Sequence, residues 1–257
     1  RILDAAAKLT AENVLNVILL GAEDEVNAAA KEAGYDIAKC QIVDPEKYAD
    51  IDAMVDEMVA LRKGKMTADE VRAALAKSNY FGTMLVKMGK ADCLLGGATY
   101  SSADTVRPAL QLIKTKPGNK IVSSCFIMVK GDKKLAMGDC AINIAPNEDE
   151  LTEIAIETAK TAKVFGIDPK VAMLSYSTYG SGKGDMVTLV ANATKKVKET
   201  APDLAVDGEL QFDAAVAPEV AKVKCSGSPV AGQANTFIFP DINAGNIGYK
   251  IAARLGD

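Results

Sequence analysis

Three hydroxyl side chains and an arginine follow a pair of glycines in one short stretch of the chain. The glycines are Gly96 and Gly97, and the polar residues after them are Ser101, Ser102, Thr105 and Arg107. Glycine lets the backbone approach a ligand closely, and the N–H groups at a helix start carry partial positive charge. Hydroxyl donors and a planar guanidinium suit the oxygens of a phosphate or a carboxylate. The stretch predicts an anion-binding site, or else an ordinary strand-to-helix turn in which Ser102 is the N-cap and Arg107 is solvated.

The segments on either side determine where these groups would point. Residues 91–95 form a short apolar run, which predicts a buried strand. Residues 106–113 carry apolar side chains at helical spacing. A strand, a glycine turn and a helix start in this order would place the hydroxyls at the carboxyl end of a strand.

In the second half of the chain, polar residues follow three predicted strands at the point where each strand ends. The strands are predicted at 171–174, 204–206 and 236–240, and the polar segments after them are 175–184, 207–213 and 241–246. Ligands of open α/β sheets bind at the carboxyl ends of the strands. These segments therefore favour a binding site, in a cleft between two domains, over a plain scaffold.

The segment 180–184, Gly-Ser-Gly-Lys-Gly, invites comparison with nucleotide-binding loops. A P-loop would need glycine at Ser177, and serine or threonine where Gly184 stands. The dinucleotide pattern fails because Val187 occupies its last glycine position. What remains is a flexible turn that tolerates anions and that we interpret as a mobile lid or as a wall for a phosphorylated ligand.

The whole chain alternates predicted strands and helices, which indicates α/β architecture with largely parallel sheets. The Pro-Gly turn within 114–120 marks a boundary, so we predict one domain over 1–117 and a second over 118–257. The second domain is expected to begin with an antiparallel hairpin, 121–129 with 135–144. The other predicted strands are 16–20 and 40–43, and the other predicted helices are 22–33, 46–63, 68 onward, 79–88, 148–164, 185–199 and 247–255.

Composition excludes several classes of function. The 257 residues carry a net charge of −4, which argues against a nucleic-acid or membrane-surface partner. Histidine is absent, so a histidine-based triad and a His-ligated metal site are excluded within these residues. The five scattered cysteines predict buried free thiols in a reducing cytoplasm. No apolar stretch is long enough for a membrane span, and the first residues do not have the layout of a signal peptide.

Four segments together resemble the phosphate acetyltransferase (phosphotransacetylase) family, within the phosphate acetyl/butyryltransferases. They are 97–109 (GATYSSADTVRPA), 173–181 (MLSYSTYGS), 207–215 (DGELQFDAA) and 237–250 (FIFPDINAGNIGYK), and they stand in the family order. The resemblance implies two αβα domains like those of isocitrate and isopropylmalate dehydrogenases, with an interdomain cleft. It also implies a homodimer.

The same resemblance implies reversible transfer of an acetyl group between acetyl phosphate and coenzyme A. CoA thiolate would attack the acetyl carbonyl directly in a ternary complex, with CoA as a substrate and no metal or cofactor. Arg107 corresponds to a functional family arginine and is the expected catalytic residue. Ser101, Ser102 and Thr105 are expected to hold the phosphoryl group, together with Ser175, Ser177 and Asn246.

Arg62 corresponds to a family arginine linked to CoA binding. From the residues alone, Arg62 beside Lys63 and Lys65 could equally be a cation placed at a helix C-terminus.

The first strand of the family is expected to lie outside these residues. So is a C-terminal segment that carries a serine, an arginine and a carboxylate.

Two alternative functions stay open. An activity on butyryl groups is one alternative function. A non-catalytic domain that senses acetyl-CoA is another.

Overall fold

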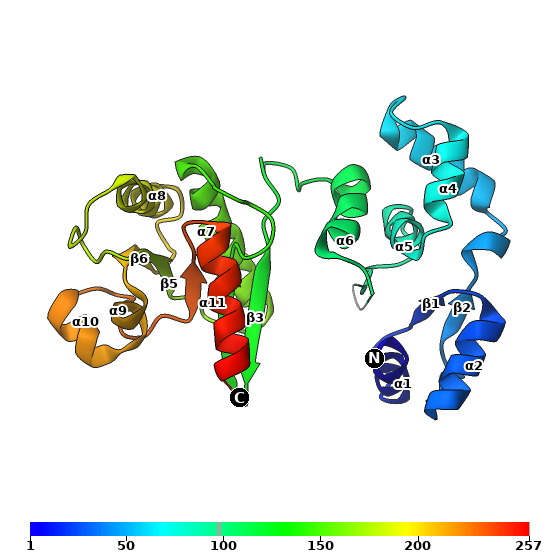
Figure 1. Ribbon diagram of the computed structural model, residues 1–257, viewed down its shortest axis with the longest axis horizontal. Helices are drawn as coiled ribbons and strands as arrows, with labels where there is room; N and C mark the ends of the chain where they lie inside the picture. Colours follow the sequence, from blue (N-terminus) through cyan, green and yellow to red (C-terminus); the bar gives the residue numbers. More distant parts are fainter. Residues whose placement is uncertain (97–98, 257) are drawn as a thin grey trace. The chain divides into compact units, whose positions relative to one another are not determined.

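The computed structural model describes residues 1–96 and 99–256, and it divides the chain into two compact units, Arg1–Lys114 and Thr115–Asp257. Figure 1 colours the elements along the chain. The predicted glycine pair is therefore described only at Gly96, because Gly97 lies outside the described residues. No helix in the described part of the chain is both long enough and apolar enough to cross a membrane.

The first unit contains two short strands and six helices among its described residues. The strands β1 (Ile18–Leu20) and β2 (Gln41–Val43) pair in parallel. The helices are α1 (Ile2–Ala11), α2 (Glu23–Ala33), α3 (Ile51–Arg62), α4 (Ala68–Leu75), α5 (Ser78–Lys87) and α6 (Ser102–Pro108), with a 3-10 turn at Pro45–Lys47 and a π-helical turn at Ala109–Ile113.

Local sequence signals fix several of these helix ends. Gly34 ends α2 with φ of 73°, a left-handed conformation that glycine adopts without a steric penalty. Thr67 and Glu70 form a capping box at the start of α4, as the spacing predicts. By contrast, the predicted helix over 46–63 begins only at Ile51, because the Pro45–Lys47 turn comes first.

A compact apolar core joins α3, α4 and α5 to the π-helical turn. Its side chains are at most 1% exposed and include Met54, Met58, Leu75, Phe81, Met84 and Leu112. Burying several large side chains of this kind is the main stabilising term in such a unit. The core fixes α5, which in turn contacts the polar segment described below.

The strand predicted over 91–95 is wrong. These residues form no strand, and Leu95 is 73% exposed. An apolar run becomes a strand only when a neighbouring strand accepts and donates its backbone hydrogen bonds, and in the described residues β1 and β2 pair only with each other. Leu94 instead rests its side chain against Gly82 of α5.

The second unit is built on one mixed sheet of five strands in the order β3-β4-β7-β5-β6. β3 and β4 form the predicted antiparallel hairpin, and the other neighbours pair in parallel. The strands are β3 (Cys125–Lys130), β4 (Lys133–Gly138), β5 (Val171–Leu174), β6 (Val206–Leu210) and β7 (Thr236–Ile238), and the helices are α7 (Glu148–Val164), α8 (Asp185–Thr200), α9 (Phe212–Val216), α10 (Pro218–Lys224) and α11 (Ile242–Leu255).

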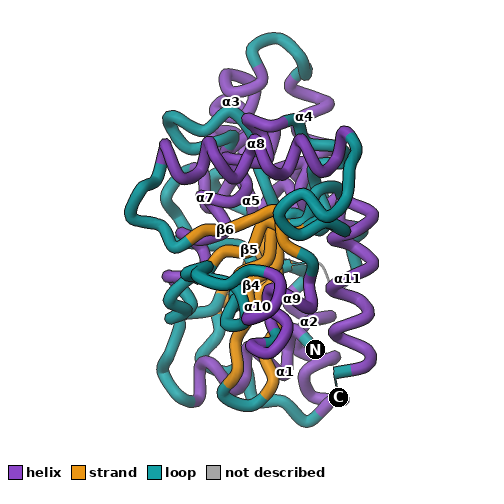
Figure 2. Tube along the Cα trace, turned by 90° about the vertical axis from the view of Figure 1, so that its left-hand side faces the viewer, coloured by secondary structure: helices purple, strands orange, loops and turns teal. Residues whose placement is uncertain are grey.

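Strand β5 shows why helices cover both faces of this sheet. All four of its residues are buried. Val171 and Met173 pack with α7 and α8, whereas Ala172 and Leu174 pack with α9 and α10 on the opposite face. Figure 2 shows α8 on one side of β5 and β6, with α9 and α10 on the other. The expected α/β fold class with mostly parallel sheets is confirmed.

Two polar segments predicted as loops belong to regular elements instead. Residues 207–210 lie within β6, where Asp207 and Glu209 are at most 4% exposed. Helix α11 begins at Ile242, five residues earlier than predicted, and the Asp241 side chain caps it by accepting from the Ala244 N–H. Asp207 and Glu209 look like loop residues in the sequence because the donors that allow their burial come from distant parts of the chain.

Candidate functional site

The start of α6 gathers most of the predicted anion-binding residues. Ser101, not Ser102, is the N-cap, and its hydroxyl accepts from the Asp104 N–H at 3.1 Å. The same hydroxyl donates to the Asp104 carboxylate at 2.7 Å. Thr105 Oγ1 donates to the Ser101 carbonyl at 3.0 Å. The helix therefore begins at Ser102, one residue before the start that a Ser102 cap would give, and its cap is part of the candidate site.

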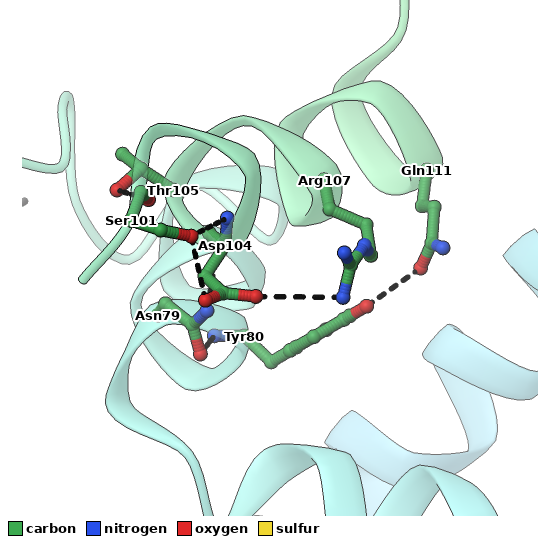
Figure 3. Close-up of polar contacts among 7 residues, drawn as sticks. All are labelled: Asn79, Tyr80, Ser101, Asp104, Thr105, Arg107 and Gln111. Atoms are coloured by element: carbon green, nitrogen blue, oxygen red, sulfur yellow. Dashed lines mark hydrogen bonds and ion pairs between the residues drawn. The ribbon is translucent and has the colours of Figure 1, made fainter.

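Arg107 lies one turn further along the same helix (Figure 3). Its Nη1 is 3.4 Å from the Asp104 carboxylate, and the two side chains are 56% and 47% exposed. An exposed pair at this spacing stabilises a helix by only about 0.3–0.5 kcal/mol. The Arg107 guanidinium is therefore accessible, and an anion that binds it more tightly than Asp104 does can replace that carboxylate.

Backbone donors at the same helix start add to this arrangement. The first N–H groups of a helix precede its first intrahelical bond. Ser101 takes up the N–H of Asp104, and the Ser101 carbonyl accepts from the Thr105 N–H. Ser102 and Ala103 come earlier in the helix, so their N–H groups have no intrahelical acceptor, and both residues are exposed. This turn, with the hydroxyls and Arg107, can bind the oxygens of a phosphate.

Three successive residues of α5 hold this segment in place, and sequence reasoning missed all three. Ser78 Oγ is 2.7 Å from the Tyr100 hydroxyl. Asn79 Nδ2 donates to the Asp104 carbonyl at 2.7 Å, and the Tyr80 hydroxyl donates to Gln111 at 2.9 Å. Figure 3 shows the last two contacts on either side of Arg107. These hydrogen bonds join residues that are far apart in the sequence, so the local pattern of α5 gave no signal for them.

Arg62 is the last residue of α3, as predicted, and is partly buried. Its Nε is buried and has no hydrogen-bond partner among the described residues. A buried donor without a partner loses the hydrogen bond that water would have given it. An incoming ligand that accepts a hydrogen bond would satisfy this atom.

In the second unit, the segment after β5 is tied to β6. Ser177 is fully buried; its hydroxyl donates to Glu209 Oε1 at 3.0 Å and accepts from the Gly182 N–H at 2.9 Å. The Gly180 N–H also donates to Glu209 Oε1, at 2.6 Å. The Ser175 hydroxyl accepts from the Ser177 N–H at 3.1 Å. These bonds hold the turn to Glu209 of β6, which favours the wall over the lid.

Asp207 forms a second buried tie from β6. Its carboxylate accepts from the hydroxyls of Tyr179 and Ser228 and lies 2.9 Å from Lys198 Nζ. Burial acts to raise the pKa of Asp207, but these three donors outweigh it and hold the pKa below its ordinary value. Burial, and then the bond to this carboxylate, raise the pKa of Tyr179 to about 12. Tyr179 therefore stays a hydrogen-bond donor at neutral pH.

Asn246 lies in the second turn of α11 and joins it to the loop after β4. Its Nδ2 donates to the Cys140 carbonyl at 3.0 Å, and its Oδ1 accepts from Lys250 at 2.7 Å. The neighbouring Gly245 is required, because a Cβ there would be 2.3 Å from the Asp139 carbonyl oxygen. Asn246 thus has a structural role in this unit whether or not it touches a ligand.

The buried Asp139 carboxylate organises that same loop. It accepts from the Ser124 hydroxyl and from the N–H groups of Ala141, Ile142 and Asn143. Burial acts to raise the pKa of Asp139, and the hydrogen bonds, led by the one from Ala141, lower it overall. The carboxylate is ionised at neutral pH and is fully committed to structure.

The expectation of buried thiols holds only in part. Cys140 and Cys225 are buried, Cys40 and Cys125 are partly buried, and Cys93 is exposed because residues 91–95 are not a strand. Burial, followed by the nearby Asp139 charge, raises the pKa of Cys140 to about 12, so its thiol is unreactive at neutral pH. Within the described ranges, His, Cys, Asp and Glu side chains form no group of three that could hold a metal ion.

Comparison with known proteins identifies the family. Residues 1–257 match the family model described as phosphate acetyl/butaryl transferase. The chain is 54% identical to the phosphate acetyltransferase of Bacillus subtilis (strain 168) over 257 residues, which are 100% of this chain and 80% of that protein.

Two solved structures agree with this result. A phosphotransacetylase from Streptococcus pyogenes superposes with a TM-score of 0.91 at 53% identity, over 98% of this chain and 78% of that one. The EutD phosphotransacetylase from Staphylococcus aureus gives a TM-score of 0.89 at 49% identity, over 99% and 78% of the two chains. The chain therefore belongs to the phosphate acetyl/butaryl transferase family, and it is an acyltransferase enzyme.

Proposed function

We propose that this enzyme transfers an acetyl group reversibly between acetyl phosphate and coenzyme A by direct attack in a ternary complex. The CoA thiolate forms a C–S bond to the acetyl carbonyl carbon. The bond from that carbon to the phosphate oxygen breaks, and inorganic phosphate leaves with the electron pair. The thiol proton passes to solvent water when the thiolate forms. Direct attack needs no oxidant, metal or covalent enzyme intermediate.

The observation that carries the proposal is the cluster at the start of α6. Arg107 contacts Asp104, whose carboxylate also accepts from the Ser101 hydroxyl, and both lie in the short helix whose exposed first turn begins at Ser102. As phosphate leaves, negative charge grows on its oxygens, and a preoriented guanidinium stabilises that charge. Arg107 is weakly held by Asp104, so the phosphoryl group of the substrate can replace that carboxylate.

Ser101, Ser102 and Thr105 supply the remaining phosphate contacts in this proposal. The Ser101 hydroxyl donates to the Asp104 carboxylate, and the Thr105 hydroxyl donates to the Ser101 carbonyl. Both groups turn toward the phosphate when it binds. For Ser175 and Asn246, contact with the phosphate remains a prediction that rests on the family resemblance. Ser177 was predicted with them, but its buried position supports a role in holding the loop.

Arg62 is proposed to bind CoA. Support comes from its buried Nε, which has no partner among the described residues. CoA carries phosphate groups that accept hydrogen bonds from a guanidinium.

The proposal includes a homodimer that works in the cytoplasm. Helix α11 exposes Ile247, Ile251 and Leu255 at spacings of four residues, which puts them on one face. A second copy is the partner we propose for that face. Free cysteines among the described residues suit a reducing compartment. Light scattering of the purified protein tests the dimer, and a monomer at all concentrations would contradict it.

The experiment that tests the reaction is acetyl-CoA formation from acetyl phosphate and CoA by the purified protein. Initial rates at several fixed concentrations of each substrate should give intersecting lines in a double-reciprocal plot, as a ternary complex requires. Parallel lines would indicate a covalent intermediate and contradict direct attack. Butyryl phosphate, assayed in the same way, distinguishes the acetyl from the butyryl activity. Binding of CoA without turnover would support the sensing domain.

A further inference from the structure

One hydrogen bond that a regular helix would make is missing in α6. Pro108 lies inside the helix and has no N–H. The carbonyl four residues earlier, that of Asp104, therefore loses its intrahelical donor. Both residues flank the turn that carries Arg107, so whatever satisfies this carbonyl also fixes that turn.

The missing donor comes from a neighbouring helix. Asn79 Nδ2 donates to the Asp104 carbonyl at 2.7 Å. Asn79 is 8% exposed, and its Oδ1 accepts from the Tyr80 N–H at 2.9 Å, one of the free N–H groups at the start of α5. Each end of the amide thus serves a different helix. Aspartate has the same shape but lacks the donor, and leucine lacks both groups.

We infer that Asn79 is a positioning residue for Arg107: its amide replaces the bond that Pro108 removes and so sets the direction of the turn that presents the guanidinium. The inference rests on the proposed phosphate role of Arg107. Ser78 and Tyr80 support it from either side through Tyr100 and Gln111. A purely structural role would predict a loss of stability with no selective effect on one substrate.

The first test separates these two roles. In the purified full chain, Asn79→Ala should raise the KM for acetyl phosphate or lower kcat by about 10-fold or more, because a satisfied carbonyl is left unpaired. The KM for CoA should stay close to that of the unchanged protein. Thr83→Val is the matched control, since Thr83 is buried on the same helix and its hydroxyl bonds within α5, to the Asn79 carbonyl. It should lower the melting temperature without the selective kinetic effect.

A double-mutant cycle gives the sharper result. Pro108→Ala supplies a backbone N–H that can bond to the Asp104 carbonyl. The kinetic effect of Asn79→Ala should therefore be several-fold smaller in the Pro108→Ala background than in the unchanged protein. Equal effects in the two backgrounds would overturn the inference, as would kinetics of Asn79→Ala that match those of Thr83→Val.

Amide hydrogen exchange over 101–113 provides a readout that does not depend on turnover. Asn79→Ala should speed exchange in that segment, and the added Pro108→Ala change should slow it again. If the unchanged protein forms no acetyl-CoA, the proposed function fails, and the kinetic half of this inference fails with it. Exchange over 101–113 that is the same with and without Asn79→Ala would overturn the positioning claim whatever the activity.

Discussion

Ser101 and Asp104 exchange two hydrogen bonds, one from the Ser101 hydroxyl to the carboxylate at 2.7 Å and one from the Asp104 N–H to that hydroxyl at 3.1 Å. The same carboxylate lies 3.4 Å from Arg107. One acidic side chain therefore orients the N-cap and the arginine together. The carboxylate holds Ser101 through two hydrogen bonds and Arg107 only weakly, so an anion can replace it at the arginine.

Replacing Ser101 tests the importance of this cap. Ser101→Ala removes the acceptor for the Asp104 N–H and should cost about 1 kcal/mol in helix stability, with a several-fold rise in the KM for acetyl phosphate. Ser101→Thr keeps the hydroxyl and should stay close to the unchanged protein. The measurement is steady-state kinetics with acetyl phosphate varied. An Ala variant as active as the Thr variant would show that the hydroxyl has no role.

Arg62→Ala should act on the other substrate. Loss of the guanidinium should raise the KM for CoA about 10-fold or more while the KM for acetyl phosphate stays unchanged, because charged hydrogen bonds to phosphate are strong. Arg72→Ala is the matched control, since Arg72 is an exposed arginine of the same unit paired with Asp52. A rise in the KM for acetyl phosphate alone would contradict the assignment of Arg62 to CoA.

Glu209 is expected to hold the segment after β5 to the sheet. Glu209→Gln keeps the side-chain shape and the Oε1 acceptor for Ser177 and Gly180, but it removes the carboxylate charge that strengthens both bonds. The expected loss is about 1–3 kcal/mol of unfolding free energy. Urea unfolding measures it, with Glu219→Gln as the control because Glu219 is exposed. Equal midpoints for the two variants would refute this role.

The lowered pKa of Asp207 predicts how stability depends on pH. A carboxyl whose pKa is lower in the folded state than in the unfolded one adds stability above its unfolded pKa, about 3.9. That stability is lost as the pH falls from there through the folded value. Asp207→Asn should be less stable at neutral pH and should show a shallower loss below about pH 4. Unfolding by urea at several pH values measures both, and an unchanged acid slope would contradict the prediction.

Local signals predicted much of the fold. The capping boxes at Thr67 and Asn147 and the C-cap at Gly34 lie within a few residues of the ends they fix, so the helix starts and stops could be read from the sequence. The hairpin of β3 and β4 was predicted from its turn. The family predicted from the four motifs is confirmed by the family model and the relatives.

Two of the errors share a physical cause, which is dependence on distant partners. Residues 91–95 look like a strand but find no strand to pair with in the described chain. Asp207 and Glu209 look like loop residues, but donors from Tyr179, Ser228 and Ser177 allow them to be buried in β6. The family motifs supplied most of the predicted site residues, such as Arg107. No motif pointed to Asn79, although Pro108 alone shows that the Asp104 carbonyl needs a donor from outside its helix.

The central claim is that Arg107 stabilises the phosphate as it leaves, and the most direct measurement is acetyl-CoA formation by Arg107→Ala beside the Arg72→Ala control. The proposal predicts a loss of about 10²–10³-fold in kcat/KM for acetyl phosphate with Arg107→Ala, the size expected for removing one preoriented donor. Arg72→Ala should keep the rate of the unchanged protein. Equal rates for the two variants would contradict the account.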